Sequence, residues 1–251
     1  MIRLSILALC LSSIDCFPTL WKHKPRLDDI PKDPVEVYPL FKKEAMVRLD
    51  YGAFVGRDRR KTRQYFGIPY AAPPIDDLRF EHPQPPKKFY GVKEVFRHGN
   101  GCFQDPMSVP LFGLALNRSE DCLNLSIWAP EGHSEEDEPI PVMVWILPGG
   151  FTSGYVSNPL YSKAFYLTID GGNIVRNSKE KVMVVSFNYR MGFFGWTASR
   201  EFQDAGLLNM GIYDIIAAFE WVKKYIHKFG GDPNRVTAFG ESAGGSMCFI
   251  F

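Results

Sequence analysis

The chain has 251 residues, of which 45% are hydrophobic and 23% charged, and its formal net charge is +1 at pH 7. This length allows one large domain with a sizeable core, and so small a net charge provides no generally basic surface for nucleic acid. No apolar run is long enough to cross a bilayer. We therefore expect no nucleic-acid partner and no transmembrane segment, and we expect neither a cofactor nor a metal ion.

The N-terminal stretch MIRLSILALCLSSIDCFP has the pattern of a secretory signal peptide. Arg3 provides the positive charge, residues 4–11 form a short apolar run, and small and polar residues follow. We expect residues 1–16 to be a cleaved signal peptide and the protein to be secreted and extracellular; a buried terminal segment is the alternative. Residues 17–43 combine prolines and charges without periodicity, which indicates a leader segment.

Three cysteines lie beyond the expected signal peptide, Cys102, Cys122 and Cys248. In an oxidising compartment Cys102 and Cys122 are natural disulfide partners, and Cys248 is left over. Closing such a loop would constrain the unfolded chain by roughly 3 kcal/mol, and two buried thiols are the alternative. Glycosylation sequons begin at Asn117 and Asn124, and we expect the first to carry a glycan and the second to be hidden.

The second half of the chain alternates strand and helix patterns. Apolar runs predict strands at 123–130, 141–147, 181–190 and 235–240, and apolar residues spaced three and four apart predict a helix at 211–229. This alternation favours an α/β sheet that is covered on both faces. Upstream, a β pattern starts at Val47, and the Pro-rich stretch 69–86 favours extended, turn-rich chain.

A nucleophile motif follows the last predicted strand. Residues 240–244 read Gly-Glu-Ser-Ala-Gly, and the small, apolar residues after them predict a buried helix. The motif alone is common by chance, but a strand before it and a helix after it form the setting of a nucleophile elbow. Ser242 would stand at the tip of this turn, and the backbone N–H of Ala243 would point at a developing oxyanion.

A second glycine-rich loop directly follows the strand at 141–147. Gly149 and Gly150 are our candidates for further oxyanion donors, whereas Pro148 has no N–H to donate. Because ligands bind at the carboxyl ends of strands in such sheets, both loops would meet at one edge. A plain turn is the alternative interpretation of this loop.

Several blocks of the sequence resemble the type-B carboxylesterases, the cholinesterase-like α/β-hydrolases, in the order in which they occur in that family. The resemblance spans residues 44–251. The blocks are FGIPYAAPPIDDLRF (66–80), SEDCLNLSIWAP (119–130), WILPGGF (145–151), NYRMGFFGW (188–196), NMGIYDIIAAFEWV (209–222) and FGESAGG (239–245).

The resemblance implies the N-terminal part of an α/β-hydrolase domain, with a mostly parallel central sheet flanked by helices. It implies that Ser242 attacks a small-molecule carboxylic ester through an acyl-enzyme, with Gly149, Gly150 and Ala243 as the oxyanion hole. Glu241 would act on the electrostatics of the pocket.

The resemblance also implies a disulfide between Cys102 and Cys122, and an ion pair between Arg79 and Glu120. Two departures from the family pattern are visible. Leu147 and Pro148 replace the residues that usually open the oxyanion loop, and the loop between the two cysteines contains no Trp. Cholinesterases have a choline-binding Trp in that loop, so a general esterase is favoured over a cholinesterase.

The nine residues after Ser242 include no His, Asp or Glu, although in this family the triad acid and histidine follow the serine. Of the five histidines, His133 and His227 should lie at the opposite edge of the sheet, and the other three are expected to be surface or structural histidines. They are His23, His82 and His98. We therefore expect negligible turnover from these 251 residues alone. The alternative is a non-catalytic, cholinesterase-like binding or adhesion module.

Overall fold

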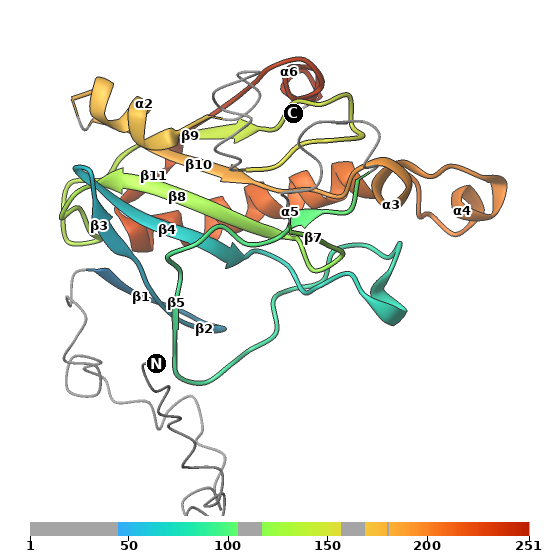
Figure 1. Ribbon diagram of the computed structural model, residues 1–251, viewed down its shortest axis with the longest axis horizontal. Coiled ribbons are helices and arrows are strands. Elements are labelled where there is room, and N and C mark those ends of the chain that lie inside the picture. Colours follow the sequence, from blue (N-terminus) through green and yellow to red (C-terminus); the bar gives the residue numbers. More distant parts are fainter. Residues whose placement is uncertain (1–44, 105–116, 157–168, 180, 251) are drawn as a thin grey trace, which may run out of the picture.

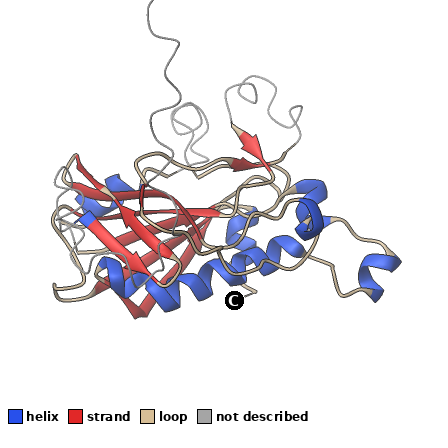
Figure 2. Cartoon of the chain, turned by 90° about the horizontal axis from the view of Figure 1, so that it is seen from below, coloured by secondary structure: helices blue, strands red, loops and turns tan. Residues whose placement is uncertain are grey.

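The protein was analysed as a computed structural model that describes residues 45–104, 117–156, 169–179 and 181–250. Its centre is a six-stranded sheet with helices on both sides (Figures 1 and 2). In spatial order the strands are β11 (Gly231–Gly240), β9 (Ile140–Ile146), β10 (Met183–Phe187), β8 (Asn124–Pro130), β4 (Thr62–Pro69) and β3 (Arg57–Arg59).

Smaller elements surround this sheet. The strands β1 (Met46–Leu49), β2 (Gly52–Val55) and β5 (Val92–Glu94) form a three-stranded sheet, and β6 (Gly101–Cys102) pairs with β7 (Arg118–Ser119). The helices are η3 (Asp76–Leu78), α2 (Gly171–Asn177), α3 (Gly192–Trp196), α4 (Arg200–Asp204), α5 (Met210–Tyr225), η6 (Ile226–Phe229) and α6 (Ala243–Met247). Within the described ranges, no helix combines the length and apolar character needed to span a bilayer.

The helices α2 and α5 cover opposite faces of the sheet. A Cβ on Gly171 in α2 would lie 2.9 Å from the Val184 side chain. On the other face, the ring of Phe219 in α5 packs against the ring of Phe187, with centroids 6.0 Å apart. Because successive side chains of a strand point to opposite faces, Val184 and Phe187 face opposite ways. The strand between them is fully buried, as its continuous apolar run predicts.

The part of the central sheet that the structure describes contains both parallel and antiparallel pairs. The neighbours β11, β9 and β10 are parallel, whereas β10–β8, β8–β4 and β4–β3 are antiparallel. The reason is visible in the chain: β3 and β4 are joined by a two-residue turn, which permits only antiparallel pairing, and parallel strands need a longer crossover. The apolar runs in the sequence predict burial of a strand but not its direction.

The predicted helix at 211–229 is observed as α5 followed by η6, and its regularly spaced apolar residues are not all equally buried. Ile215 and Val222 are fully buried, but Ile216 and Phe219 are only half-buried. Asp214 is fully buried on the same helix, which the hydrophobic pattern did not indicate.

The disulfide and the ion pair implied by the family resemblance are both present. A disulfide joins Cys102 to Cys122, whose Cα atoms are 4.9 Å apart. Arg79 donates from Nε and Nη2 to the two carboxylate oxygens of Glu120, at 2.5 and 2.8 Å. This pair is exposed, so we assign it little stability. Cys248 is a free thiol.

The two sequons differ in exposure. Asn117 is exposed, whereas Asn124 is 8% exposed and its Nδ2 donates to the carbonyls of Asn100 and Cys122. An asparagine whose amide is already engaged inside the fold is a poor glycan acceptor, as the strand-like context of Asn124 predicts.

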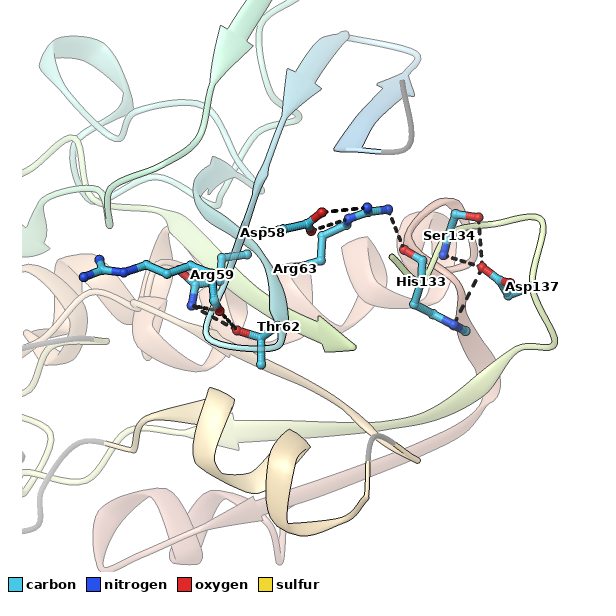
Figure 3. A network of polar contacts seen from close by, with 8 residues as sticks. Asp58, Arg59, Thr62, Arg63, His133, Ser134 and Asp137 are labelled. Atoms are coloured by element: carbon cyan, nitrogen blue, oxygen red, sulfur yellow. Dashed lines mark hydrogen bonds and ion pairs between the residues drawn. The ribbon is translucent and has the colours of Figure 1, made fainter. Parts of the chain in front are cut away.

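A buried arginine ties the β3–β4 hairpin to the loop before β9 (Figure 3). Arg63 is 1% exposed and donates to both carboxylate oxygens of Asp58, at 2.9 and 3.1 Å, and to the backbone oxygen of His133 at 3.0 Å. The His133 ring in turn lies 3.0 Å from the carbonyl of Gly230, which immediately precedes β11. This network therefore fixes the edge of the sheet at which β9 and β11 begin.

Candidate active site

Ser242 occupies a strained turn between β11 and α6. Its backbone has φ 53° and ψ −122°, outside the regions that residues with a side chain normally adopt. The strand ends at Gly240, the helix begins at Ala243, and the Ser242 side chain is exposed. Strain of this kind persists only where the surrounding structure enforces it, and it is typical of functional positions.

Two glycines of the motif make this turn sterically possible. A Cβ on Gly244 would lie 2.2 Å from the backbone oxygen of Ile146, and one on Gly240 would lie 2.5 Å from the carbonyl carbon of Gly244. Neither contact is tolerable, because real Cβ atoms do not approach backbone atoms so closely. The start of α6 therefore packs directly against the end of β9, and only glycine permits this approach.

The second glycine-rich loop begins beside the elbow. Gly240 pairs with Ile146 across the parallel strands β11 and β9, so the chain leaves both strands at one edge of the sheet. In the loop, Gly149 has φ 114° and Gly150 has φ 60°, both in the region that favours glycine. A Cβ on Gly149 would lie 1.8 Å from the carbonyl oxygen of Ser153.

This loop leaves backbone donors available. The carbonyl of Gly149 accepts from the N–H groups of Thr152 and Ser153, at 3.1 and 3.0 Å. No described residue accepts a hydrogen bond from the N–H of Gly149, Gly150 or Ala243. These three N–H groups are the candidate oxyanion donors named from the sequence, and they belong to two adjacent loops.

Side chains that the sequence analysis did not single out hold this loop in place. The hydroxyl of Tyr189 donates to the carbonyl of Leu147 at 2.9 Å. Gln104 brackets Gly154: its Nε2 donates to the glycine carbonyl at 2.9 Å, and its Oε1 accepts from the glycine N–H at 3.0 Å. The loop forms although Pro148 stands where the family usually has glycine. No sequence signal identified these anchors, because each joins positions far apart in the chain.

A buried ion pair fixes the segment that follows β10. Asp214 accepts from the backbone N–H of Arg190 at 2.9 Å and from its Nε and Nη2 at 2.8 Å each. The Arg190 side chain is 3% exposed and that of Asp214 is not exposed at all. Tyr189, the anchor of the oxyanion loop, immediately precedes Arg190, so this pair supports the loop indirectly.

His98 is a structural histidine and lies far from Ser242. Its Nδ1 is 2.8 Å from Oγ of Ser126 in β8, and its ring stacks on Phe66 with centroids 3.9 Å apart. In the sheet, β10 and β9 separate β8 from β11. Three inter-strand spacings amount to about 14 Å, which is beyond hydrogen-bonding reach of the elbow.

The pKa of His98 leads to a prediction about stability. Burial, and then repulsion from Arg57, lower the pKa of His98 to about 3, whereas an unfolded histidine titrates near 6.5. The unfolded state therefore takes up the proton first, and the stability from neutral His98 is lost as the pH falls below about 6.5. Between pH 7.5 and pH 5 we expect the free energy of unfolding of the wild type to fall by about 2 kcal/mol because of His98. The variant His98→Phe should not show this fall, and urea denaturation at the two pH values measures both proteins. An equal loss in both proteins would contradict this expectation.

Of the other described histidines, two lie near the start of β11, at the end of the strand opposite to Ser242, and the third is engaged elsewhere. His133 binds the Gly230 carbonyl near the start of β11, and His227 lies in η6 at the same end, as predicted. The His82 Nε2 lies 3.1 Å from the carbonyl of Gly206, and its ring packs against Tyr213. His23 lies outside the described residues.

Comparison with known proteins identifies the family. The sequence matches the model of the Carboxylesterase family over residues 43–251. The chain belongs to this family. It is 39% identical over 201 residues to para-nitrobenzyl esterase of Bacillus subtilis, a match that covers 80% of this chain and 38% of that protein. It is also 43% identical over 194 residues to acetylcholinesterase of Danio rerio, covering 74% of this chain and 28% of that one.

The solved carboxylesterase structures agree with this assignment. A structure described as a thermophilic pNB esterase superimposes with a TM-score of 0.71 at 38% identity, covering 81% of this chain and 40% of the other. The fold is therefore that of the α/β-hydrolase carboxylesterases. The chain spans about two fifths of the length of the esterases that it matches, so the described sheet is one part of the full fold.

The strained backbone of Ser242 gives a second prediction. Glycine adopts φ 53° and ψ −122° without a steric penalty, so Ser242→Gly should raise the free energy of unfolding by about 1 kcal/mol. Ser242→Ala keeps the Cβ and should leave stability nearly unchanged. Urea denaturation of the three proteins measures both effects, and a destabilised glycine variant would show that the turn is not strained.

Proposed function

We propose that this protein is a carboxylic-ester hydrolase whose nucleophile is Ser242. The single observation that supports this most is the Ser242 backbone, held in a strained conformation at the turn from β11 to α6. The exposed serine stands beside three N–H groups without a described acceptor, and this arrangement suits attack on a carbonyl.

The reaction would proceed through an acyl-enzyme. Oγ of Ser242 attacks the ester carbonyl carbon while its proton passes to a base, and the carbonyl electron pair moves onto oxygen. The N–H groups of Gly149, Gly150 and Ala243 stabilise this oxyanion. Collapse of the tetrahedral intermediate expels the alcohol, which takes up the proton, and water then releases the acid by the same route.

The base has to come from outside the residues that the structure describes. No described histidine is placed to accept the Ser242 proton, because each lies at another position of the fold or is engaged elsewhere. A serine without a base is a weak nucleophile, and only oxyanion and binding effects remain when a triad member is missing. We propose that the 251 residues by themselves turn over esters negligibly.

A general ester suits the sequence better than a choline ester. The segment between Cys102 and Cys122 contains no Trp that could bind a quaternary ammonium group. The relatives include proteins named para-nitrobenzyl esterase and carboxylesterase 1E. We therefore propose simple aryl and alkyl carboxylic esters as the substrate class.

Secretion is part of the proposal. The pattern of residues 1–16 and the Cys102–Cys122 disulfide both suit the secretory pathway. Expression in a eukaryotic secretory host should deliver the protein to the medium and shift its N-terminus to near residue 17, as N-terminal sequencing would show. Retention of an intact Met1 inside the cell would contradict it.

Activity measurements on two proteins test the proposed chemistry. The first is the 251-residue chain, and the second joins residues 44–251 to the remaining C-terminal part of the Bacillus subtilis esterase, which supplies candidate triad partners. We expect aryl-ester hydrolysis only from the second, and its loss in Ser242→Ala. Hydrolysis by the first protein would refute the claim that the base is missing from the 251 residues. A folded but inactive second protein would refute the hydrolase assignment.

A further inference from the structure

The β3–β4 hairpin presents a row of cations at one edge of the six-stranded sheet, where β3 is the outermost strand. The sequence GRDRRKTR (56–63) supplies Arg57, Arg59, Arg60 and Lys61. The last three are exposed, and Arg57 is half-buried with its guanidinium 5.9 Å from the centre of the Phe66 ring.

Arg97 extends this row along the same edge. The N–H of Phe66 in β4 donates to the carbonyl of Val95 at 2.7 Å, so the segment around residues 95–97 continues the edge beyond Arg57, the first residue of β3. Burial, and then repulsion from Arg59 and Arg97, lower the pKa of Arg57. We call Arg57, Arg59, Arg60, Lys61 and Arg97 the edge cluster.

No described carboxylate pairs with the edge cluster. The one acidic residue within the row, Asp58, points to the other side of the hairpin, where Arg63 binds both of its oxygens. Figure 3 shows Arg59 extending away from the Asp58–Arg63 pair. Four charges of the cluster are therefore on exposed side chains and the fifth is on half-buried Arg57, and none of them has a carboxylate partner in the described part of the chain.

The turn between β3 and β4 has two charged residues at positions where the backbone conformation favours other residue types. Arg59 pairs with Thr62, so Arg60 and Lys61 form a two-residue turn, and their φ angles are 52° and 59°. Positive φ at both positions is the pattern that favours Asn-Gly, and long side chains are disfavoured there. Local rules are typically broken in this way where a residue serves a function other than folding.

We propose that the edge cluster is a binding site for a linear sulfated polysaccharide. Arg57 and Arg59 lie on one face of β3, about 7 Å apart along the strand, and the turn continues the row, which suits a chain with sulfate groups at intervals. Guanidinium groups recognise such oxyanions by paired hydrogen bonds.

Two features favour a polysaccharide over a membrane or a nucleic acid. None of the exposed large hydrophobic residues in the described chain belongs to the hairpin or to residues 95–97, so nothing there would insert into lipid or stack on bases. The Cys102–Cys122 disulfide indicates an oxidising, extracytosolic environment.

Edge protection is the competing explanation, because charged side chains on an edge strand also prevent strand-to-strand association. Edge protection predicts that loss of the cations causes self-association while binding of a polyanion is unchanged. The polysaccharide proposal predicts that loss of the cations weakens binding of a polyanion.

Heparin is the probe for the test, and the 251-residue chain is the protein. The variant Arg59→Thr, Arg60→Asn, Lys61→Gly removes three charges and gives the turn its favoured residues, so it should remain folded by circular dichroism. The control Lys87→Ser, Lys88→Ser, Arg200→Ser removes three exposed charges outside the cluster. Heparin affinity at 0.15 M NaCl should fall at least about tenfold in the variant, and the slope of log affinity against log salt concentration should be smaller by about two to three. In the control, the affinity should change less than about twofold.

Three results would overturn the proposal: unchanged heparin binding by the variant, an equal loss in the control, or tighter binding of the wild-type chain to single-stranded DNA or anionic vesicles at the same salt concentration. Unchanged binding together with oligomers in light scattering would assign the cations to edge protection.

Discussion

Asp214→Ala is expected to lower the free energy of unfolding by about 3–5 kcal/mol, because it leaves a buried arginine charge without a partner. Asp214 accepts three hydrogen bonds from Arg190, one of them from the backbone, and neither side chain has meaningful access to water. Chemical denaturation of the wild type and the variant measures the loss.

A double variant separates the buried charge from simple packing. Replacing both partners, in Arg190→Met with Asp214→Leu, removes the uncompensated charge and should recover most of the stability lost in Asp214→Ala. If the double variant is as unstable as the single one, the pair does not act mainly through its charges.

Gly244→Ala is expected to cost about 3 kcal/mol, because the new methyl group would overlap the end of β9. The Cβ would lie 2.2 Å from the backbone oxygen of Ile146, and neither α6 nor the strand can move away without breaking the elbow. In the protein completed with a relative's C-terminal part, the same variant should lose its ester hydrolysis.

Gly245→Ala is the matched control for this prediction. Gly245 is the next residue of the same helix, and outside that helix its Cβ would come no closer than 3.3 Å, to the carbonyl oxygen of Gly240, a contact that a shift of a few tenths of an ångström relieves. Alanine is also the better helix former by about 1 kcal/mol, so this variant should be destabilised far less than Gly244→Ala. Equal destabilisation of both variants would show that close packing at Gly244 is not what forms the elbow.

The sequence predicted the elements that depend on local pattern. The strand, turn and helix around Ser242 appear where the motif and the flanking apolar residues placed them. The buried strand β10 and the helix α5 follow from their apolar runs, because burial and helical periodicity leave a direct mark on residue type.

Features that depend on pairing between distant residues could not be predicted in this way. The antiparallel half of the sheet, the buried Asp214 and the Tyr189–Leu147 hydrogen bond each depend on which segments meet in space. The Cys102–Cys122 disulfide was anticipated from the cysteines left in an oxidising compartment as well as from the family resemblance, whereas the Arg79–Glu120 pair was anticipated only through the resemblance.

Fluorophosphonate labelling followed by peptide mass spectrometry tests the central claim, that Ser242 is a nucleophile whose base lies beyond the described residues. We expect an adduct on the peptide that contains Ser242 in the protein completed with the C-terminal part of the Bacillus subtilis esterase, and almost none in the 251-residue chain. An adduct on another residue of the completed protein, or full labelling of Ser242 in the 251-residue chain, would contradict it.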